Sequence, residues 1–288
     1  MEIIIGSHVS FLKNNQLVGC VESALSYNAN TFMFYTGSTQ STIRFDIDEN
    51  LTKKAFELML KNNINPKNVI VHAPYIINLA NNIDEKKYNF YINFLKNELL
   101  RCDALGFDKL VLHPGSMVSI PYENAIDNIA FGLDQALEGT KANILLEYMS
   151  GKGTEVGSSI IDLKNILSKV KNKNRVFVCL DRCHMNDSGV DIVNIDDFLN
   201  EFDKEIGIDK IKCVHVNDSK NVIGSRKDRH ENIGYGSIGF NKLLKVIYND
   251  KLKNIPMILE TPFVGDKAPY KYEIEMIRNK KFIDFIKR

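Results

Sequence analysis

Six histidine or carboxylate side chains stand at the ends of short apolar runs in this chain of 288 residues. Each follows two to four apolar residues, as in VIVH, LVLH, ILLE and VCLD, and neighbours in the series are 34 to 45 residues apart. The six are His72, His113, Glu147, Asp181, His215 and Glu260. Imidazoles mixed with carboxylates are ligands that suit zinc, manganese or iron. The pattern therefore predicts a metal site assembled from distant parts of the chain.

A second set of ligand types lies close to the first in sequence. His184 follows Asp181 by three residues, and Asp228 and His230 stand in the long segment after the seventh apolar run. Nine candidates exceed what one or two four-coordinate sites need, so we expect a carboxylate such as Glu147 to bridge two ions. Any one of them alone fits a core or capping role, but burying so many ionisable groups without a metal would be costly.

Eight apolar runs position these residues, and longer amphipathic stretches such as 84–106 and 195–207 separate them. The runs are too short for buried helices and favour strands covered on both faces. They begin near residues 2, 31, 68, 109, 143, 176, 211 and 256. Strands alternating with helices predict an α/β fold, a (β/α)₈ TIM barrel formed by one domain over residues 1–288. A doubly wound open sheet is the rival.

Closure into a barrel would bring the carboxyl ends of all strands to one face, where the active sites of such barrels are built. His8 ends the first run and could face the same site, as an outer-shell partner of a ligand or as a structural residue. The five cysteines are odd in number and lack CxxC spacing, so we expect buried free thiols. They are Cys20, Cys102, Cys179, Cys183 and Cys213.

Composition limits the partners. The 37 basic residues nearly cancel the 36 acidic ones, so the net charge of +1 does not by itself indicate nucleic-acid binding, and any phosphate-binding surface must be local. No apolar run is long enough to span a bilayer, and the start of the chain lacks the features of a signal peptide. We expect no membrane partner and a cytoplasmic location.

The motifs around the ligand types extend over nearly the whole chain. They are GSHVS at 6, HAPYIINLA at 72, LHPGS at 112, LLEYMSGKGTEVGS at 145, CLDRCH at 179, HVNDSKNVIGSRKDRHENIGYGSIG at 215 and LETPF at 259. With these motifs the sequence resembles the endonuclease IV family of abasic-site endonucleases, within the xylose-isomerase-like TIM barrels. The stretch from DSK through GSRKDRH to the glycines is the most specific part.

The resemblance implies three divalent metal ions, zinc in the first place, with manganese or iron as alternatives. One ion would take His72, His113 and Glu147, a second Asp181, His215 and Glu260 with Glu147 shared, and a third His184, Asp228 and His230. Ions of this kind lower the pKa of bound water to about 7 and stabilise a leaving oxygen. Glu147 and Glu260 are the catalytic candidates.

The implied reaction is cleavage of double-stranded DNA on the 5′ side of an abasic site, leaving a 3′-hydroxyl and a 5′-deoxyribose phosphate. This is a step of base excision repair, and cleaning of blocked 3′ ends is the expected side activity. We expect the protein to work as a monomer. Zinc-dependent phosphodiester hydrolysis of this kind is the function that the resemblance predicts.

DNA contacts are expected from the loops on the same face. Tyr75 and Ile76 match the place where the family inserts side chains into the duplex, and the basic residues are Lys220, Arg226, Lys227 and Arg229. The chain departs from the family after the second strand, where YTGSTQST lacks the arginine that some members use to fill the gap, and Gln40 is the nearest substitute.

Two other functions fit parts of the pattern. A sugar isomerase or epimerase of the same barrel superfamily would also carry His, Glu and Asp at its strand ends, but needs a smaller ligand set. A non-catalytic lesion-binding protein would keep the loops without turnover. The separate group of His184, Asp228 and His230 disfavours the first alternative, and the complete ligand set disfavours the second.

Overall fold

The eight apolar runs form eight parallel strands of one closed barrel. The computed structural model describes residues 3–39 and 41–286. The strands, in their order around the barrel, are β1 (Ile5–His8), β10 (Met257–Leu259), β7 (Ile211–His215), β6 (Val176–Asp181), β5 (Asn143–Glu147), β4 (Lys109–Leu112), β3 (Ile70–His72) and β2 (Thr31–Phe34). The predicted (β/α)₈ barrel is confirmed, and the open sheet is wrong because β1 pairs with both β2 and β10.

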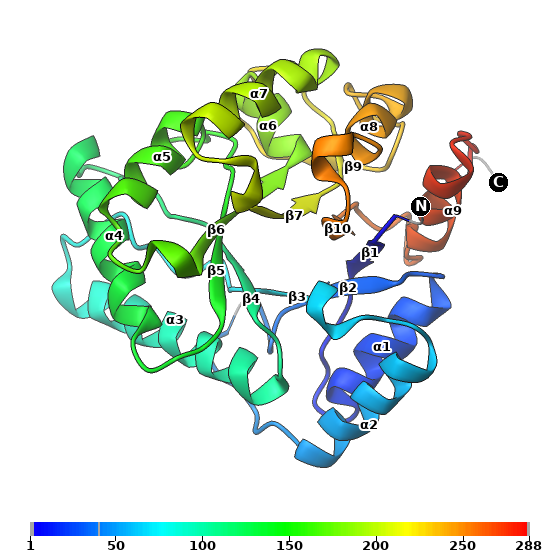
Figure 1. Ribbon diagram of the computed structural model, residues 1–288, viewed down its shortest axis with the longest axis horizontal. Helices are drawn as coiled ribbons and strands as arrows, with labels where there is room; N and C mark the ends of the chain where they lie inside the picture. The colour runs from blue at the N-terminus through cyan, green and yellow to red at the C-terminus, as the bar shows by residue number, and fades with distance from the viewer. Residues whose placement is uncertain (1–2, 40, 287–288) are drawn as a thin grey trace.

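Helices follow the strands and surround them, as Figure 1 shows. They are α1 (Gln16–Ser26), α2 (Glu49–Lys61), α3 (Glu85–Leu105), α4 (Tyr122–Leu137), α5 (Ile160–Lys169), α6 (Arg182–Ser188), α7 (Ile195–Glu205), α8 (Phe240–Ile247) and α9 (Tyr270–Asn279). Five 3₁₀ turns lie between elements, at Pro66–Asn68, Lys173–Arg175, Ile192–Asn194, Ile208–Lys210 and Asp250–Leu252. The amphipathic stretches 84–106 and 195–207 correspond to α3 and α7.

Helix α3 illustrates how local sequence sets these boundaries. The Asp84 side chain accepts a hydrogen bond from the Lys87 N–H, which satisfies one of the free donors at the start of the helix. Gly106 ends the helix with a φ of 79°, a left-handed conformation that glycine adopts without a steric penalty. The helix packs on the barrel through residues such as Leu95 and Leu99, which are fully buried.

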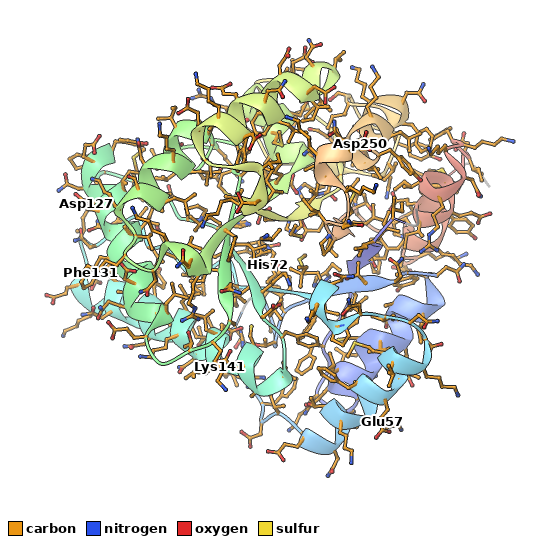
Figure 2. The ribbon with its side chains drawn as sticks, viewed as in Figure 1. Glu57, His72, Asp127, Phe131, Lys141 and Asp250 are labelled. Atoms are coloured by element: carbon orange, nitrogen blue, oxygen red, sulfur yellow. The ribbon has the colours of Figure 1, made fainter. Side chains whose placement is uncertain are left out.

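The barrel interior is layered, because alternate residues of a strand point to the same side. One layer consists of fully buried residues from seven strands: Met33, Ile70, Val111, Leu145, Cys179, Cys213 and Ile258. The residue two positions further along six of these strands is a predicted metal ligand. The ligand types therefore form the next layer toward the carboxyl end. In Figure 2, His72 lies near the middle of the view, whereas Glu57, Asp127 and Phe131 lie on the surrounding helices.

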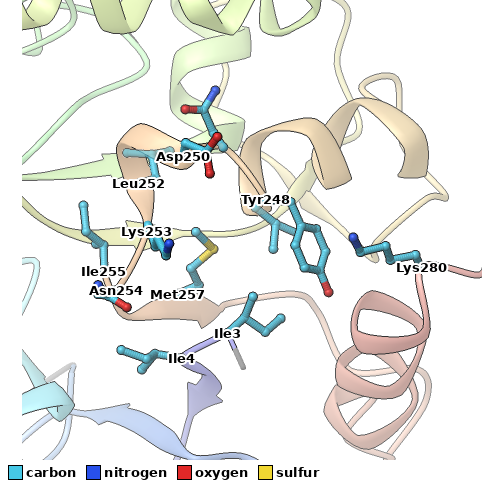
Figure 3. Close-up of a pocket in the computed structure, with 12 residues that line it drawn as sticks. Ile3, Ile4, Tyr248, Asp250, Leu252, Lys253, Asn254, Ile255, Met257 and Lys280 are labelled. Atoms are coloured by element: carbon cyan, nitrogen blue, oxygen red, sulfur yellow. The ribbon is translucent and has the colours of Figure 1, made fainter. Parts of the chain in front are cut away.

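The two ends of the barrel differ in character. At the amino end a cavity of about 330 Å³ lies beside the entrances to β1 and β10, lined by residues such as Ile3, Ile4 and Met257. Tyr248 and Lys280 close one side of it, with the Lys280 ammonium 3.9 Å from the centre of the Tyr248 ring (Figure 3). Beyond the carboxyl end, β8 (Asp218–Ser219) and β9 (His230–Glu231) form a small antiparallel hairpin that was not predicted from the sequence.

Among the described residues, no helix combines the length and the apolar character needed to cross a bilayer.

Candidate metal centre

Glu147, the last residue of β5, lies at the centre of the ligand cluster and is buried. One carboxylate oxygen, Oε2, is 3.2 Å from Nε2 of His72 and 2.9 Å from Nε2 of His113. The other, Oε1, is 3.0 Å from Nδ1 of His215 and 3.4 Å from Nδ1 of His184. The two oxygens thus face different imidazoles that could hold an ion, those of His72 and His113 on one side and that of His215 on the other, which is the arrangement that a bridging carboxylate needs.

A second group gathers around His215 at the end of β7. Its Nδ1 is 3.1 Å from Oε2 of Glu260 and 3.6 Å from Oδ2 of Asp181. Potential ligand atoms of these three residues and Glu147 all lie within 4.8 Å of one another. One divalent ion could therefore contact all four side chains after small movements.

The third group lies beyond the strand ends. Oδ1 of Asp228 is 3.1 Å from Nε2 of His184 and 3.5 Å from Nε2 of His230. The structure also brings His230 within 3.8 Å of Asp181, so this group is continuous with the second. All nine predicted ligand residues thus come together at the carboxyl end of the barrel.

The second ring nitrogen of three histidines has a backbone partner. The Nδ1 of His72 is 2.7 Å from the Ala73 carbonyl oxygen, that of His184 is 3.0 Å from the Tyr148 oxygen, and that of His230 is 3.2 Å from the Glu260 oxygen. A carbonyl can only accept, so Nδ1 donates to it and Nε2 is the nitrogen that would bind an ion in the cluster. Hydrogen bonds of this kind orient the histidines of metal sites.

The charges of the cluster are coupled. Burial would raise the pKa of Glu147, but His215 and His113 outweigh it and hold that pKa well below its usual value. Burial would lower the pKa of His184, but Asp181, Asp228 and Glu147 together raise it well above its usual value. Ionised carboxylates beside protonated imidazoles are the state that bound cations would replace, since metal binding displaces protons.

The space above the cluster is an open pocket of about 520 Å³. Its lining consists of His72, Tyr75, His113, Glu147, Glu155, His184, Asp228, His230 and Glu260. A charged group of substrate size could therefore reach seven of the nine ligand residues directly. The fully buried Asp181 and His215 lie deeper.

Several residues that orient the ligands were not predicted from the sequence. Asn217, which is fully buried, donates from Nδ2 to Asp181 at 2.8 Å, and its Oδ1 accepts from the Glu260 N–H at 2.8 Å. Asp187 on α6 accepts hydrogen bonds from the Ser219 hydroxyl and from the Asp228 N–H. The alternation in HVN, with Asn217 two residues after His215, is a signal that could have pointed to Asn217.

Tyr75 forms one wall of the pocket. Its ring centre is 5.1 Å from that of His113, and its hydroxyl lies 2.7 Å from that of Tyr35, a buried residue after β2. The Tyr75 side chain stays half exposed, as does that of the neighbouring Ile76. His8 packs against the Tyr35 ring, with ring centres 5.1 Å apart, and burial lowers the pKa of its imidazole. His8 therefore borders the site.

The basic residues of the loop after β7 are exposed on the same end of the barrel. The residues predicted to contact DNA are all exposed: Lys220, Arg226, Lys227 and Arg229. Arg226 and Asp228 have φ angles of 54° and 58° in the left-handed region, a backbone conformation that residues other than glycine seldom adopt. The loop thus turns sharply where it presents Asp228.

Gln40, the predicted substitute for the missing arginine, lies outside the described residues. The nearest arginine, Arg44, is tied down: its Nε is 2.7 Å from Oε1 of the buried Glu98, and its Nη1 donates to the carbonyl oxygens of Ser38, Ser41 and Ile43. Arg44 therefore closes the base of this loop. All five cysteines are buried free thiols, as predicted.

The comparisons with known proteins agree with this geometry. The family model described as xylose isomerase-like TIM barrel matches residues 21–280. The probable endonuclease 4 of Mycoplasma capricolum is 47% identical over 283 residues, which cover 98% of each chain. That of Mesoplasma florum is 47% identical over 290 residues, covering 99% of each chain.

Solved structures give the same result. The crystal structure of endonuclease IV from Thermus thermophilus superposes with a TM-score of 0.81 at 26% identity, covering 96% of this chain and 97% of that chain. A D-tagatose 3-epimerase-like protein shares the fold, with a TM-score of 0.70 at 20% identity and 96% coverage of both chains. By its family match and its full-length relatives, the chain belongs to the xylose isomerase-like TIM barrels and, among them, to the endonuclease IV family.

Proposed function

We propose that this protein is a metal-dependent phosphodiesterase that cuts double-stranded DNA on the 5′ side of abasic sites, leaving a 3′-hydroxyl and a 5′-deoxyribose phosphate. The role would be base excision repair, with removal of 3′-blocking groups as the side activity. One observation carries the proposal: five imidazoles and four carboxylates come together at one open pocket, seven of these residues lining it and two lying beneath, in a chain whose full-length relatives are probable endonucleases.

The donor set fits three divalent ions, with zinc first and manganese or iron as alternatives. Support comes from the contacts of Glu147, whose two oxygens face different histidines, and from Asp228, which faces both His184 and His230. Ions held there would supply activated water and electrostatic stabilisation for hydrolysis of a phosphodiester. Glu147 and Glu260 are the carboxylates that we assign to the reaction centre.

The chain's own residues would orient the substrate. Arg226, Lys227 and Arg229 are exposed near the pocket and can neutralise backbone phosphates, and Lys220 stands at the base of the same loop. Tyr75 and Ile76 present half-exposed apolar surface beside the ligands, suitable for stacking against an opened duplex. Local positive charge in this loop would compensate for a net charge of only +1.

A sugar epimerase is disfavoured as the alternative. The third ligand group of His184, Asp228 and His230 has no role in a reaction that needs one ion, and the similarity to an epimerase-like structure at 20% identity concerns the fold. A lesion-binding protein without turnover would leave this buried ligand set unused.

The decisive experiment uses a duplex oligonucleotide with one tetrahydrofuran abasic analogue. Zinc-loaded protein should nick the strand at the 5′ side of the analogue, and chelator-treated protein should not nick until zinc is restored. An undamaged duplex of the same sequence is the control. Metal-loaded protein that binds the oligonucleotide and never cuts it would contradict the proposal and favour the lesion-binding alternative.

A further inference from the structure

His215 is oriented differently from the three histidines that have a carbonyl partner. Its Nδ1, not its Nε2, faces the carboxylates, at 3.0 Å from Glu147 and 3.1 Å from Glu260. Its Nε2 is buried and has no hydrogen-bond partner among the described residues. A ring nitrogen of a metal-binding histidine ordinarily has an oxygen partner on the side away from the ion. Within the described part of the chain, Nε2 of His215 therefore lacks the oxygen partner that this nitrogen ordinarily has in a metal-binding histidine.

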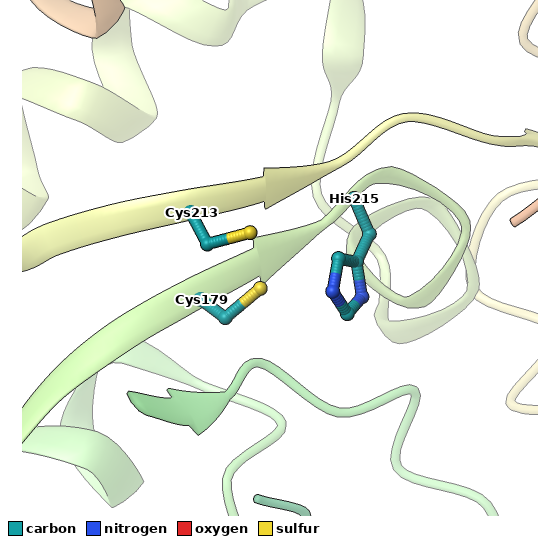
Figure 4. Close-up of side chains that lie close together, drawn as sticks. All are labelled: Cys179, Cys213 and His215. Carbon is teal, nitrogen blue, oxygen red and sulfur yellow. The ribbon is translucent and has the colours of Figure 1, made fainter. Parts of the chain in front are cut away.

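Two thiols lie on that side. Cys179 on β6 and Cys213 on β7 are register partners, both fully buried, and they stand two residues before Asp181 and His215. Figure 4 shows their sulfur atoms and one edge of the His215 ring turned toward one another. The other members of this hydrophobic cluster have aliphatic or thioether side chains, so the two thiols are its ionisable groups.

The three groups have the spacing of a metal site. Their ligand atoms all lie within 4.8 Å of one another. An ion at the centre of such a triangle is at most about 2.8 Å from each atom, and zinc–sulfur bonds are about 2.3 Å long, so a movement of about half an ångström brings the two sulfur atoms to bonding distance.

We propose that Cys179, Cys213 and Nε2 of His215 form a second-layer site for a thiophilic d¹⁰ cation, such as Cd²⁺ or Zn²⁺, directly beneath the cluster of carboxylates and histidines. Two sulfur ligands and one imidazole select soft ions, whereas the carboxylates above accept harder ones. Binding releases three protons to solvent, two from the thiols and one from Nε2 of His215, so that the ring binds as an imidazolate. His215 is then a bridge, with Nδ1 serving the upper cluster and Nε2 the lower ion.

Occupation of this site has a consequence for the upper cluster. The two thiolates and the imidazolate carry three negative charges against the two positive charges of the ion, so the lower site adds no net positive charge beneath the cluster, and its ion shares the His215 ring with the ions above. The lower ion would therefore act on the upper cluster through the shared ring of His215 and not through added positive charge. The inference goes beyond the proposed function, because metal binding at the thiols is measured without DNA.

The test is a titration of the zinc-loaded protein with Cd²⁺, followed by the ultraviolet charge-transfer absorption of cadmium thiolates and by X-ray absorption at the cadmium edge. We expect one thiolate-bound Cd²⁺ per chain and a sulfur shell in the absorption spectrum. Cys179→Ser and Cys213→Ser should each abolish the signal at one equivalent. Cys102→Ser, which removes a buried thiol on α3, should keep it.

Three results would overturn the proposal. Cadmium bound to the wild-type protein through oxygen and nitrogen alone would do so, and this measurement needs no variant to fold. A sulfur signal that survives in folded Cys179→Ser and Cys213→Ser proteins would do so as well. Loss of the signal in Cys183→Ser alone would assign the thiolate to Cys183, beside Asp228 and His230. None of these results depends on whether the protein nicks DNA.

Discussion

The ligands at the strand ends and those beyond them are held in place by different means. Six lie at the last residue of a barrel strand or directly after it, and the register of these strands is fixed by pairs such as Glu147 with Cys179 and Asp181 with His215. His184 lies on α6, and Asp228 and His230 lie in the segment after β7. The first part needs only the barrel to form, whereas the second depends on tertiary contacts of a long loop.

Two buried carboxylates supply those contacts. Asp187 accepts from the Asn221 side chain at 2.8 Å and from the Asp228 N–H at 2.9 Å. Asp218 accepts from the backbone N–H groups of Ile238 and Gly239. Backbone donors pointing at a buried carboxylate stabilise its charge and fix the loop around it. The strand part and the loop part of the site should therefore fail separately when each is disturbed.

The largest effect is expected from Glu147→Gln in the strand part. Loss of a carboxylate that faces four histidines should remove two ions at once and lower the nicking rate by about 10³-fold. Metal analysis of the purified protein and single-turnover nicking measure both quantities. Gln has the same shape as Glu, so the far-ultraviolet circular dichroism should not change. Retention of all ions in the variant would contradict the bridging role.

Asp187→Asn should affect only the loop part. The amide cannot accept all the hydrogen bonds that the carboxylate accepts, so Asp228 loses its support and the ion of His184, Asp228 and His230 should bind about 10- to 100-fold more weakly. Metal content should fall by one ion per chain. Asp191→Asn, at the exposed start of the turn Ile192–Asn194, is the control and should keep the full content. Equal metal content in both variants would mean that the loop keeps Asp228 in place without the hydrogen bonds to the Asp187 carboxylate.

Lowering the pH should remove the metal ions from both the strand part and the loop part of the site. Burial would lower the pKa values of His184 and His215, but the surrounding carboxylates, with Cys179 in the case of His215, raise both well above the usual value. The metal-free protein therefore keeps these protons to higher pH, and an ion must displace them. Metal affinity should fall by roughly tenfold per pH unit for each proton displaced as the pH decreases. Competition titrations with a chromophoric chelator would measure it, and an affinity independent of pH would contradict this coupling.

The difference between the strand part and the loop part of the site also determines which of its residues could be predicted from the sequence. The eight strands, the barrel and the six strand-end ligands follow from short apolar runs that each end in a ligand type, a pattern local to each run. The set of His184, Asp228 and His230 was predicted from its ligand types close to Asp181 and after the seventh run, and the resemblance to the family assigned it to a third ion. Asp187, Asn217 and Tyr35 were missed, because the partners that give them a role lie 32 to 43 residues away in the chain. Only the folded barrel brings those partners together.

A buried carboxyl on α9 ties the loop after β7 to the loop after β10. Glu273 accepts from the Ile233 N–H and from the Thr261 hydroxyl, and burial raises its pKa to about 7 against these hydrogen bonds. A raised carboxyl pKa means that folding stability falls as the pH rises from the unfolded value of about 4.3 to about 7, here by about 3 kcal/mol. Glu273→Gln should lack this loss in urea unfolding at a series of pH values.

The matched control is Glu201→Gln on the exposed side of α7. Its unfolding free energy should follow that of the wild-type protein at every pH. A Glu273→Gln protein whose pH dependence equals that of the wild type would show that Glu273 is ionised in the folded protein at neutral pH. The loops would then be fastened by a charged group.

The smallest effect concerns the single hydrogen bond between a strand-end residue and a wall of the pocket. Tyr35→Phe removes the hydroxyl that lies 2.7 Å from the Tyr75 hydroxyl, while the contacts of its ring with His8 and His72 remain. A neutral hydrogen bond contributes about 1 kcal/mol, so KM for the abasic duplex should rise about fivefold with kcat nearly unchanged. Tyr248→Phe removes a comparable bond at the amino end and should change neither constant. A fall in kcat with constant KM in Tyr35→Phe would instead place Tyr75 in the chemical step, and the strand ends would then control more than metal binding.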